Sequence, residues 1–181
     1  MNAAVFIDGG YLATILKNYG SPKVDYEKLV DWACDGYQRF RAYYYDCLPY
    51  QSSNPSDEES NKLASKQRFF NKLNKIPRFT IRQGRLEYRG TSEGGSPVFV
   101  QKRVDLQLGL DIASLVSKGK IDLAVLFTGD SDFVPAVSLA QEQGVLVRLV
   151  HGPARTYHQE LWDAVDERWE LTEEIIKKYP L

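Results

Sequence analysis

The feature that most constrains the fold of this chain is the apolar segment Ile121–Phe127, which is followed at once by the polar residues Thr128–Asp132. An apolar run of this length is typical of a central parallel strand that helices cover on both faces. A helical pattern continues from about Phe133 to Gln143, and Val145–Val150 is a second apolar segment of strand length. Strands that alternate with helices in this way predict an α/β protein with a parallel sheet.

The rest of the chain continues this alternation. Strand patterns lie at residues 3–7, 40–47 and 168–171, and helical patterns lie at residues 11–19, 26–37, 58–73, 104–117, 158–164 and 172–178. Residues 79–101 alternate apolar and basic side chains on either side of a turn at 90–97, which predicts a small hairpin excursion. At 181 residues the chain fits one domain. We therefore expect a single domain over residues 1–181, folded as a three-layer α/β/α sandwich, with the hairpin at 79–101 and a C-terminal helix within 172–181.

Acidic residues follow two of the predicted strands. Asp8 comes after the first strand, and Asp130 and Asp132 come after the apolar segment. Ligands of open α/β sheets bind outside the carboxyl ends of the strands, so these three carboxylates converge if their strands are neighbours. Asp105, near the start of a predicted helix, adds a fourth. Carboxylates packed together need a compensating cation, and an all-oxygen set of ligands matches Mg²⁺ or Mn²⁺.

The same segments have simpler structural interpretations. An aspartate after a strand often caps the next helix, and this alternative stays open for Asp130 and Asp132. Thr128 and Ser131 are either caps or groups that hold a metal-bound water. Asp111 lies about 120° around its helix from the acid near the helix start, so its position there indicates a polar-face residue.

The charges are distributed unevenly along the chain. In total, 23 basic and 24 acidic residues give a net charge of −1, with an isoelectric point of about 6.1. Residues 62–103 hold eleven Lys or Arg and two acids, a net charge of +9, which leaves −10 for the remainder. Such asymmetry indicates a polyanionic partner. Arg82 and Arg85, with Tyr88 near them, are candidates for contacts to phosphates and unpaired bases, although a run of charges on a helix is usually only a solvated face.

Several classes of protein are excluded. No apolar run approaches the roughly 18 residues that a membrane span needs. The residues from Met1 to Leu12 lack a basic region and include an aspartate, unlike a secretory signal peptide. Cys34 and Cys47 are too few for a disulfide framework or a cysteine-based zinc site. We therefore expect a cytoplasmic protein with no membrane partner.

Four segments together resemble one known family. They are FIDGGYL (Phe6–Leu12), YYYD (Tyr43–Asp46), FVQKRVDLQLGLDI (Phe99–Ile112) and FTGDSDFVPAV (Phe127–Val137). In this order and rough spacing they resemble the NYN domain family, specifically its LabA-like bacterial branch, within the superfamily of PIN-like nucleases. The resemblance extends from about Asn2 to Leu171.

The resemblance implies a Rossmann-like PIN fold and metal-dependent ribonuclease chemistry. It implies that four acids are both catalytic and metal-binding: Asp8, Asp105, Asp130 and Asp132. Asp111 matches a further family acid, which the resemblance places in a second layer around the metal. Two positions depart from the family pattern: Tyr11 stands where many members have Asn, and Arg103 stands where the motif has Gly.

The favoured hypothesis is a Mg²⁺- or Mn²⁺-dependent endoribonuclease that cuts single-stranded RNA. Lys102 or Arg103 would steady the charge that develops on the phosphate, and Arg82 and Arg85 would bind substrate. The second hypothesis is a catalytically weak or inactive RNA-binding regulatory module, which Tyr11 motivates.

A phosphatase with a covalent nucleophile is a third hypothesis. That chemistry requires an acid two residues after Asp8, and Gly10 occupies this position. The sequence leaves open the RNA target, the choice of metal and whether the chain forms a homodimer.

Overall fold

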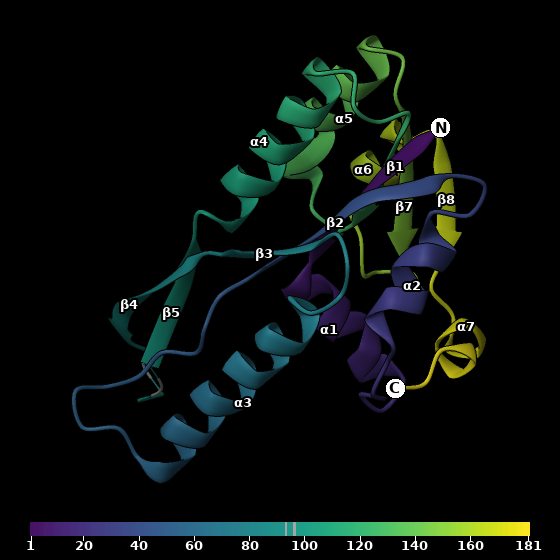
Figure 1. Cartoon of the computed structure of the whole chain (residues 1–181). Helices are drawn as coiled ribbons and strands as arrows, with labels where there is room; N and C mark the ends of the chain where they lie inside the picture. The colour runs from purple at the N-terminus through teal and green to yellow at the C-terminus, as the bar shows by residue number, and fades with distance from the viewer. Residues whose placement is uncertain (93, 96) are drawn as a thin grey trace.

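The computed structural model describes residues 1–92, 94–95 and 97–181 (Figure 1). Its main sheet has six strands, all paired in parallel, in the order β3-β2-β1-β6-β7-β8. The strands are β1 (Asn2–Asp8), β2 (Gln38–Asp46), β3 (Phe79–Gln83), β6 (Leu123–Phe127), β7 (Leu146–His151) and β8 (Glu167–Glu170). The apolar segment singled out in the sequence forms β6, and every residue of this strand is buried.

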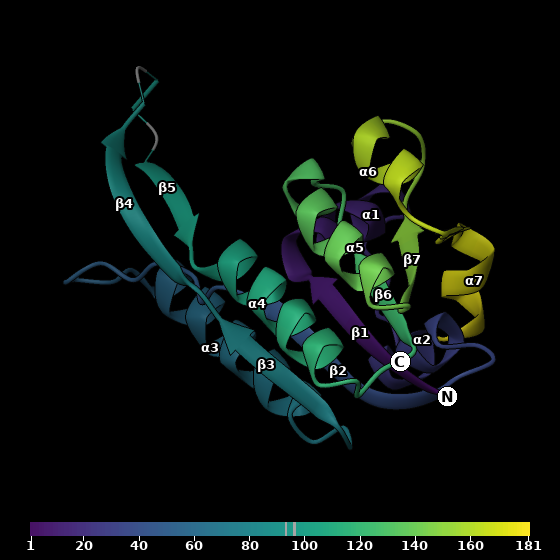
Figure 2. The same cartoon turned by 90° about the horizontal axis from the view of Figure 1, so that it is seen from above.

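Helices cover both faces of the sheet (Figures 1 and 2). One face carries α1 (Gly9–Asn18), α2 (Tyr26–Ala33), α3 (Asp57–Leu73) and α7 (Glu173–Lys178). The other face carries α4 (Val104–Ser117), α5 (Val134–Glu142) and α6 (Gln159–Ala164). The predicted three-layer α/β/α sandwich is therefore confirmed.

Strand β1 lies between two hydrophobic cores. Val5 and Ile7 belong to the core beneath α1 and α2, whereas Ala4 and Phe6 belong to the core beneath α4 and α5. All four are fully buried, and the ring of Phe6 stacks on that of Tyr43 with centroids 5.6 Å apart. Burial of each large apolar side chain stabilises the fold by about 1.5–3 kcal/mol. The end of β1 is therefore a firmly held place for a functional group.

The direction of the strand order reverses at β1. The chain runs outward from β1 to β2 and β3, then crosses to β6 and runs outward the other way to β7 and β8. In open α/β sheets the ligand crevice lies outside the carboxyl ends of the strands at such a switch point. The carboxyl ends of β1 and β6 are therefore where the topology favours a site.

The hairpin differs from the sequence prediction. Strand β3, expected as part of it, pairs in parallel with β2 and forms an edge of the main sheet. The antiparallel ribbon consists of β4 (Arg85–Thr91) and β5 (Pro97–Lys102). The chain leaves the sheet at Gly84, where a Cβ would lie 2.5 Å from Val104 Cγ2. The excursion therefore spans residues 85–102, and Glu93 and Ser96 of the predicted turn lie outside the described residues.

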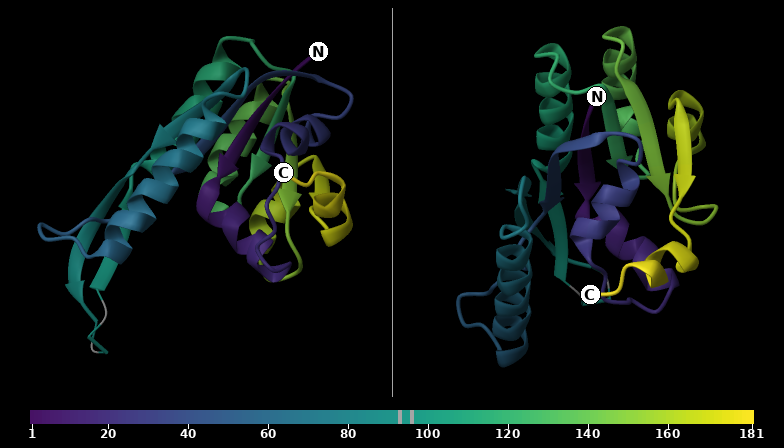
Figure 3. Two further views of the ribbon diagram at one scale, coloured as in Figure 1. Left: turned by 60° about the horizontal axis from the view of Figure 1, so that its bottom comes forward. Right: turned by 45° about the vertical axis from the view of Figure 1, so that its right-hand side comes forward.

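The ribbon β4–β5, called the hairpin arm below, projects from the body of the protein. Figures 1 and 3 show it extending beyond the sheet on the same side as the N-terminal part of α3. The connection between β2 and α3 runs close to it in the views of Figure 3. Among the helices that the structure describes, none combines the length and the apolar character that crossing a membrane requires.

Candidate active site

Asp8 ends β1 and caps α1. Its Oδ1 accepts hydrogen bonds from the backbone N–H groups of Gly10 (2.9 Å) and Tyr11 (3.1 Å). Burial raises the pKa of Asp8 most, and the carboxylates of Asp105 and Asp46 raise it further, although the two hydrogen bonds oppose this. A buried acid near other acids holds its negative charge at a cost that a bound cation offsets.

The loop after β6 brings two more of the predicted acids to this edge of the sheet. Asp130 caps the short 3-10 turn η1 (Ser131–Phe133), and its Oδ1 accepts the N–H of Asp132 at 3.0 Å. Thr128 is fully buried, and its Oγ1 accepts the N–H of Asp130 at 3.3 Å. Capping by Asp130 and Thr128 is therefore present, and it fixes the loop at the switch point.

Gly129 and Tyr11 fit this loop tightly against the connection that follows β7. A Cβ on Gly129 would lie 2.3 Å from the carbonyl oxygen of Thr156 and 2.6 Å from the ring of Tyr11. The hydroxyl of Tyr11 lies 3.4 Å from Thr156 Oγ1 and accepts the N–H of Gly152 at 3.3 Å. Burial raises the pKa of Tyr11. Tyr11, which stands where many family members have Asn, thus contacts both the loop after β6 and the loop after β7.

Asp105 lies in the first turn of α4 and connects the other acids electrostatically. Burial raises its pKa most, and the charges of Asp130 and Asp132 raise it further. Asp105 in turn raises the pKa of Asp8. The four sequence-predicted carboxylates therefore lie at one edge of the sheet, where Asp130 and Asp132 raise the pKa of Asp105 and Asp105 raises that of Asp8.

Asp46, which ends β2, is a further acid at this edge that the sequence analysis did not assign. Its carboxylate accepts the hydroxyl of Tyr44 (3.4 Å) and the next backbone N–H (2.7 Å), and it forms an ion pair with Lys66 of α3. A Cβ on Gly9 would lie 2.8 Å from Asp46 Oδ2, so this acid sits against the start of α1. The signal was available, because Asp46 is also an acid at the end of a strand.

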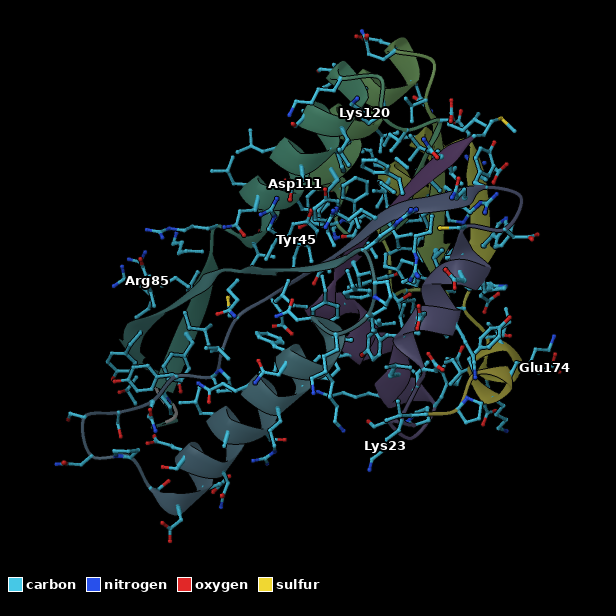
Figure 4. All side chains as sticks on the ribbon, viewed as in Figure 1. Lys23, Tyr45, Arg85, Asp111, Lys120 and Glu174 are labelled. Atoms are coloured by element: carbon cyan, nitrogen blue, oxygen red, sulfur yellow. The ribbon has the colours of Figure 1, made fainter. Side chains whose placement is uncertain are left out.

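Asp111 lies in α4 and is bound from two strands. Its carboxylate accepts Arg82 Nε and Nη2 (2.9 and 3.0 Å) and the hydroxyl of Tyr45 (2.8 Å). Figure 4 shows Tyr45 and Asp111 close together beneath α4. Asp111 raises the pKa of Arg82 through this hydrogen-bonded pair. An internal carboxylate thus engages the guanidinium of Arg82 and joins α4 to β3, and the assignment of Arg82 as a substrate contact stays a prediction.

Three cations lie where the hairpin arm meets α4. Arg85 and Lys102 are directly opposite each other in the ribbon, an arrangement of like charges that weakens a strand pair. Arg103 follows with a left-handed backbone (φ 76°) and immediately precedes α4. Within the described part of the chain none of the three forms an ion pair with an acid, and Figure 4 shows Arg85 extending away from the ribbon. These cations are available to an external anion.

The donor chemistry of the acidic edge fits a hard divalent cation. Asp8 and Asp130 each use Oδ1 for capping, and an all-oxygen set matches Mg²⁺ or Mn²⁺. Within residues 1–92, 94–95 and 97–181, however, no three His, Cys, Asp or Glu side chains are grouped so as to hold one ion together. Sharing an ion therefore requires rotation of these carboxylates toward one another.

The match of a family model, and not the sheet and its acids alone, places this chain among the PIN-like nuclease families. The chain belongs to the NYN domain family, whose model matches residues 2–171, and this family typically binds divalent metals. A protein of unknown function from Vibrio parahaemolyticus has a similar structure: it is 18% identical, with a TM-score of 0.67 over 96% of this chain and 94% of that chain. That likeness shows the fold alone. No curated protein matches the sequence.

Proposed function

We propose that this NYN domain is a Mg²⁺- or Mn²⁺-dependent endoribonuclease. The observation that carries the proposal is the position of Asp8 and Asp130 after the neighbouring strands β1 and β6, at the topological switch point, with Asp105 close enough to raise the pKa of Asp8. Asp8 and Asp130 are half-buried and Asp105 and Asp132 are exposed, and negative charges that lie near one another are favoured when a cation compensates them. The family membership agrees with this chemistry, and the four motifs favour the LabA-like branch within the family.

The proposed ligands are Asp8, Asp105, Asp130 and Asp132. A divalent ion bound there would activate water and stabilise the charge of an in-line displacement at phosphorus. The chain contributes the positions of the ligands: backbone N–H groups bind Oδ1 of Asp8 and of Asp130, which leaves Oδ2 of each carboxylate for the ion. Thr128 keeps the loop of Asp130 in place, and Ser131 starts the turn that presents Asp132.

The proposed substrate is RNA, held beside the acids by the cations at the base of the hairpin arm. Lys102 and Arg103 directly precede the helix that carries Asp105, so a phosphate that they bind lies next to the acidic edge. Arg85 faces Lys102 across the ribbon and extends this positive surface. Both cysteines are free thiols, which is consistent with the reducing cytoplasm that we propose as the location.

The test is cleavage of end-labelled RNA in the presence of Mn²⁺. We expect Asp130→Asn to lower the cleavage rate by about 100-fold or more, because it removes one metal-binding charge. Asp35→Asn is the matched control, since Asp35 is exposed and precedes β2 at the opposite edge of the sheet. Equal cleavage by the wild type and Asp130→Asn would refute the assignment.

An RNA-binding module without catalysis is the alternative that one observation favours. Tyr11 occupies the position of the usual Asn. Its hydroxyl forms hydrogen bonds with Thr156 and Gly152, so it does not serve as a metal ligand. RNA retention that weakens steeply with salt, with no cleavage under Mg²⁺ or Mn²⁺, would support this alternative. Restored cleavage in Tyr11→Asn would identify the tyrosine as the cause.

A further inference from the structure

Three aromatic side chains form one surface at the hairpin arm, called the aromatic surface below: Tyr50, Tyr88 and Phe99. The ring centroids of Tyr50 and Phe99 are 4.9 Å apart, those of Tyr88 and Phe99 are 5.9 Å apart, and those of Tyr50 and Tyr88 are 6.4 Å apart. Tyr88 is 52% exposed and Tyr50 is 41% exposed. The rings therefore contact one another and also present a large area to solvent.

The strand register explains how the aromatic surface forms. Tyr88 and Phe99 are directly opposite in the ribbon, so both side chains point to the same side of it. Leu86, two residues before Tyr88, lies on this side as well and packs against the core beneath α4. Tyr50 comes from the connection between β2 and α3, only four residues after Asp46. The aromatic surface is thus continuous with the core and close along the chain to the acidic edge.

Packing alone does not account for this surface. Rings that serve the two cores, such as Phe6 and Tyr45, are fully buried, whereas Tyr88 and Tyr50 are not. Among the described residues, the hydroxyl of Tyr88 forms a hydrogen bond only with Thr91 Oγ1, at 2.8 Å and within the ribbon. Clustered exposed aromatic side chains mark a surface that contacts a partner.

The charge beside this surface indicates what the partner is. Residues 62–103 carry a net charge of +9 in a chain whose remainder carries −10. Arg85 precedes Tyr88 by three residues, about 10 Å along the strand, so Arg85 and Lys102 point to the other side of the ribbon from the rings. A partner that meets rings on one side of a narrow ribbon and cations on its other side is a flexible polyanion with free aromatic faces. An unpaired nucleic acid strand has both, whereas a duplex hides the faces of its bases within the stack.

We propose that the aromatic surface stacks on unpaired bases of the RNA, so that the substrate of this domain is single-stranded and enters along the hairpin arm. The inference rests on the proposed function, because the arm would guide the RNA to the proposed active site. Tyr88 and Tyr50 provide stacking faces, and the cations at the base of the arm bind the backbone of the same strand. Stacking of this kind tolerates any base, so selectivity is for the unpaired state over the paired state.

The test measures binding by the full chain in EDTA, where nothing is cut, with fluorescently labelled single-stranded RNA and with the same sequence as a duplex. We expect Tyr88→Ala to weaken single-strand binding by about 10-fold and duplex binding by less than about twofold. Tyr88→Phe keeps the ring and should bind like the wild type. Leu146→Ala, which truncates a 40% exposed side chain at the start of β7, is the matched control and should change neither affinity. A melting temperature within about 2 °C of the wild type shows that Tyr88→Ala folds.

The outcomes separate this inference from the proposed function. Equal single-strand affinities of Tyr88→Ala and the wild type, or equal losses for single strand and duplex, would overturn the inference even if RNA is cleaved. A dimer of the wild type that Tyr88→Ala dissociates would overturn it too, because the surface would then bind a second copy of the chain. Stacking-dependent binding without cleavage under Mg²⁺ or Mn²⁺ would instead refute only the nuclease.

Discussion

The acidic edge and the hairpin arm hold their polar groups in opposite ways. At the acidic edge, Asp8 and Asp130 cap the elements that follow them by accepting backbone N–H groups, and the surrounding loops pack tightly around Gly129. In the hairpin arm, Arg85 and Lys102 are opposite each other with no acid paired to them among the described residues, and Tyr88 is half exposed. Catalysis requires metal ligands that a rigid scaffold holds in place. Binding of a flexible nucleic acid strand requires exposed side chains. Substitutions at the edge should therefore change stability and activity together, and those in the arm should change binding alone.

The largest effect should come from the tightest contact at the acidic edge. In Gly129→Ala the new methyl group would meet the carbonyl oxygen of Thr156 and the ring of Tyr11. A backbone group cannot move aside as a flexible side chain can, so we expect a loss of about 4 kcal/mol in the free energy of unfolding. Urea denaturation measures this loss. Gly109→Ala is the control, because no atom lies within 4 Å of its added Cβ in mid-α4, and it should stabilise the protein by about 1 kcal/mol.

The next largest effect should come from Lys66, which connects α3 to the acidic edge. Lys66→Met keeps most of the side-chain volume but leaves the buried carboxylate of Asp46 without its cation. We expect a loss of about 3 kcal/mol in the free energy of unfolding. The double variant Lys66→Met with Asp46→Asn should recover most of it, since no buried charge is then unpaired. If the double variant is no more stable than Lys66→Met, the ion pair is not the cause.

Asp8→Asn should stabilise the fold while it removes activity. Burial and neighbouring acids raise the pKa of Asp8 in the folded state, so the folded protein binds its proton more tightly than the unfolded chain. The stability that this acid contributes is therefore present at low pH and is lost as pH rises from about 4 through the folded-state pKa. Asparagine has no such cost and also caps helices well.

We expect Asp8→Asn to exceed the wild type by about 1 kcal/mol at pH 7 in EDTA. The difference should shrink as the pH falls to about 4 and below. Urea denaturation at several pH values measures it, with Asp35→Asn as the control for a surface aspartate. A difference that grows as the pH falls would contradict the sign of the pKa shift.

The sequence was sufficient to place Asp8 and Asp130 at strand ends and insufficient for contacts between distant segments. The apolar run of β6 identified a central strand, and the position of Asp130 after it follows from that alone. Asp46 was not assigned although it ends a strand, since its closeness to the start of α1 depends on the long-range pairing of β2 with β1. The ion pair of Arg82 with Asp111 was not foreseen, because the two residues are 29 positions apart and on different elements. For the same reason β3 was placed in the hairpin, although it pairs with β2.

The smallest effect on stability should come from Arg103, where the two regions meet. Its φ of 76° lies in the left-handed region, which costs a residue with a Cβ about 1–2 kcal/mol. Arg103→Gly relieves this strain but loses more backbone entropy on folding, so we expect a net gain of about 0.5 kcal/mol. The same change removes a cation beside Asp105, so RNA affinity should fall and the salt dependence of binding should decrease by about one phosphate contact.

Arg103→Ala separates the two effects, because it removes the same charge and keeps the strained backbone. Its RNA affinity should fall as far as that of Arg103→Gly, whereas its free energy of unfolding should stay at or below the wild-type value. Urea denaturation and RNA binding at several salt concentrations measure both quantities for each variant. Equal stabilities of the Gly and Ala variants would show that the left-handed backbone costs nothing here. If neither Arg103→Gly nor Arg103→Ala changes the RNA affinity, Arg103 does not belong to the proposed binding surface. The presence of Arg in place of the family's Gly would then have no role in RNA binding.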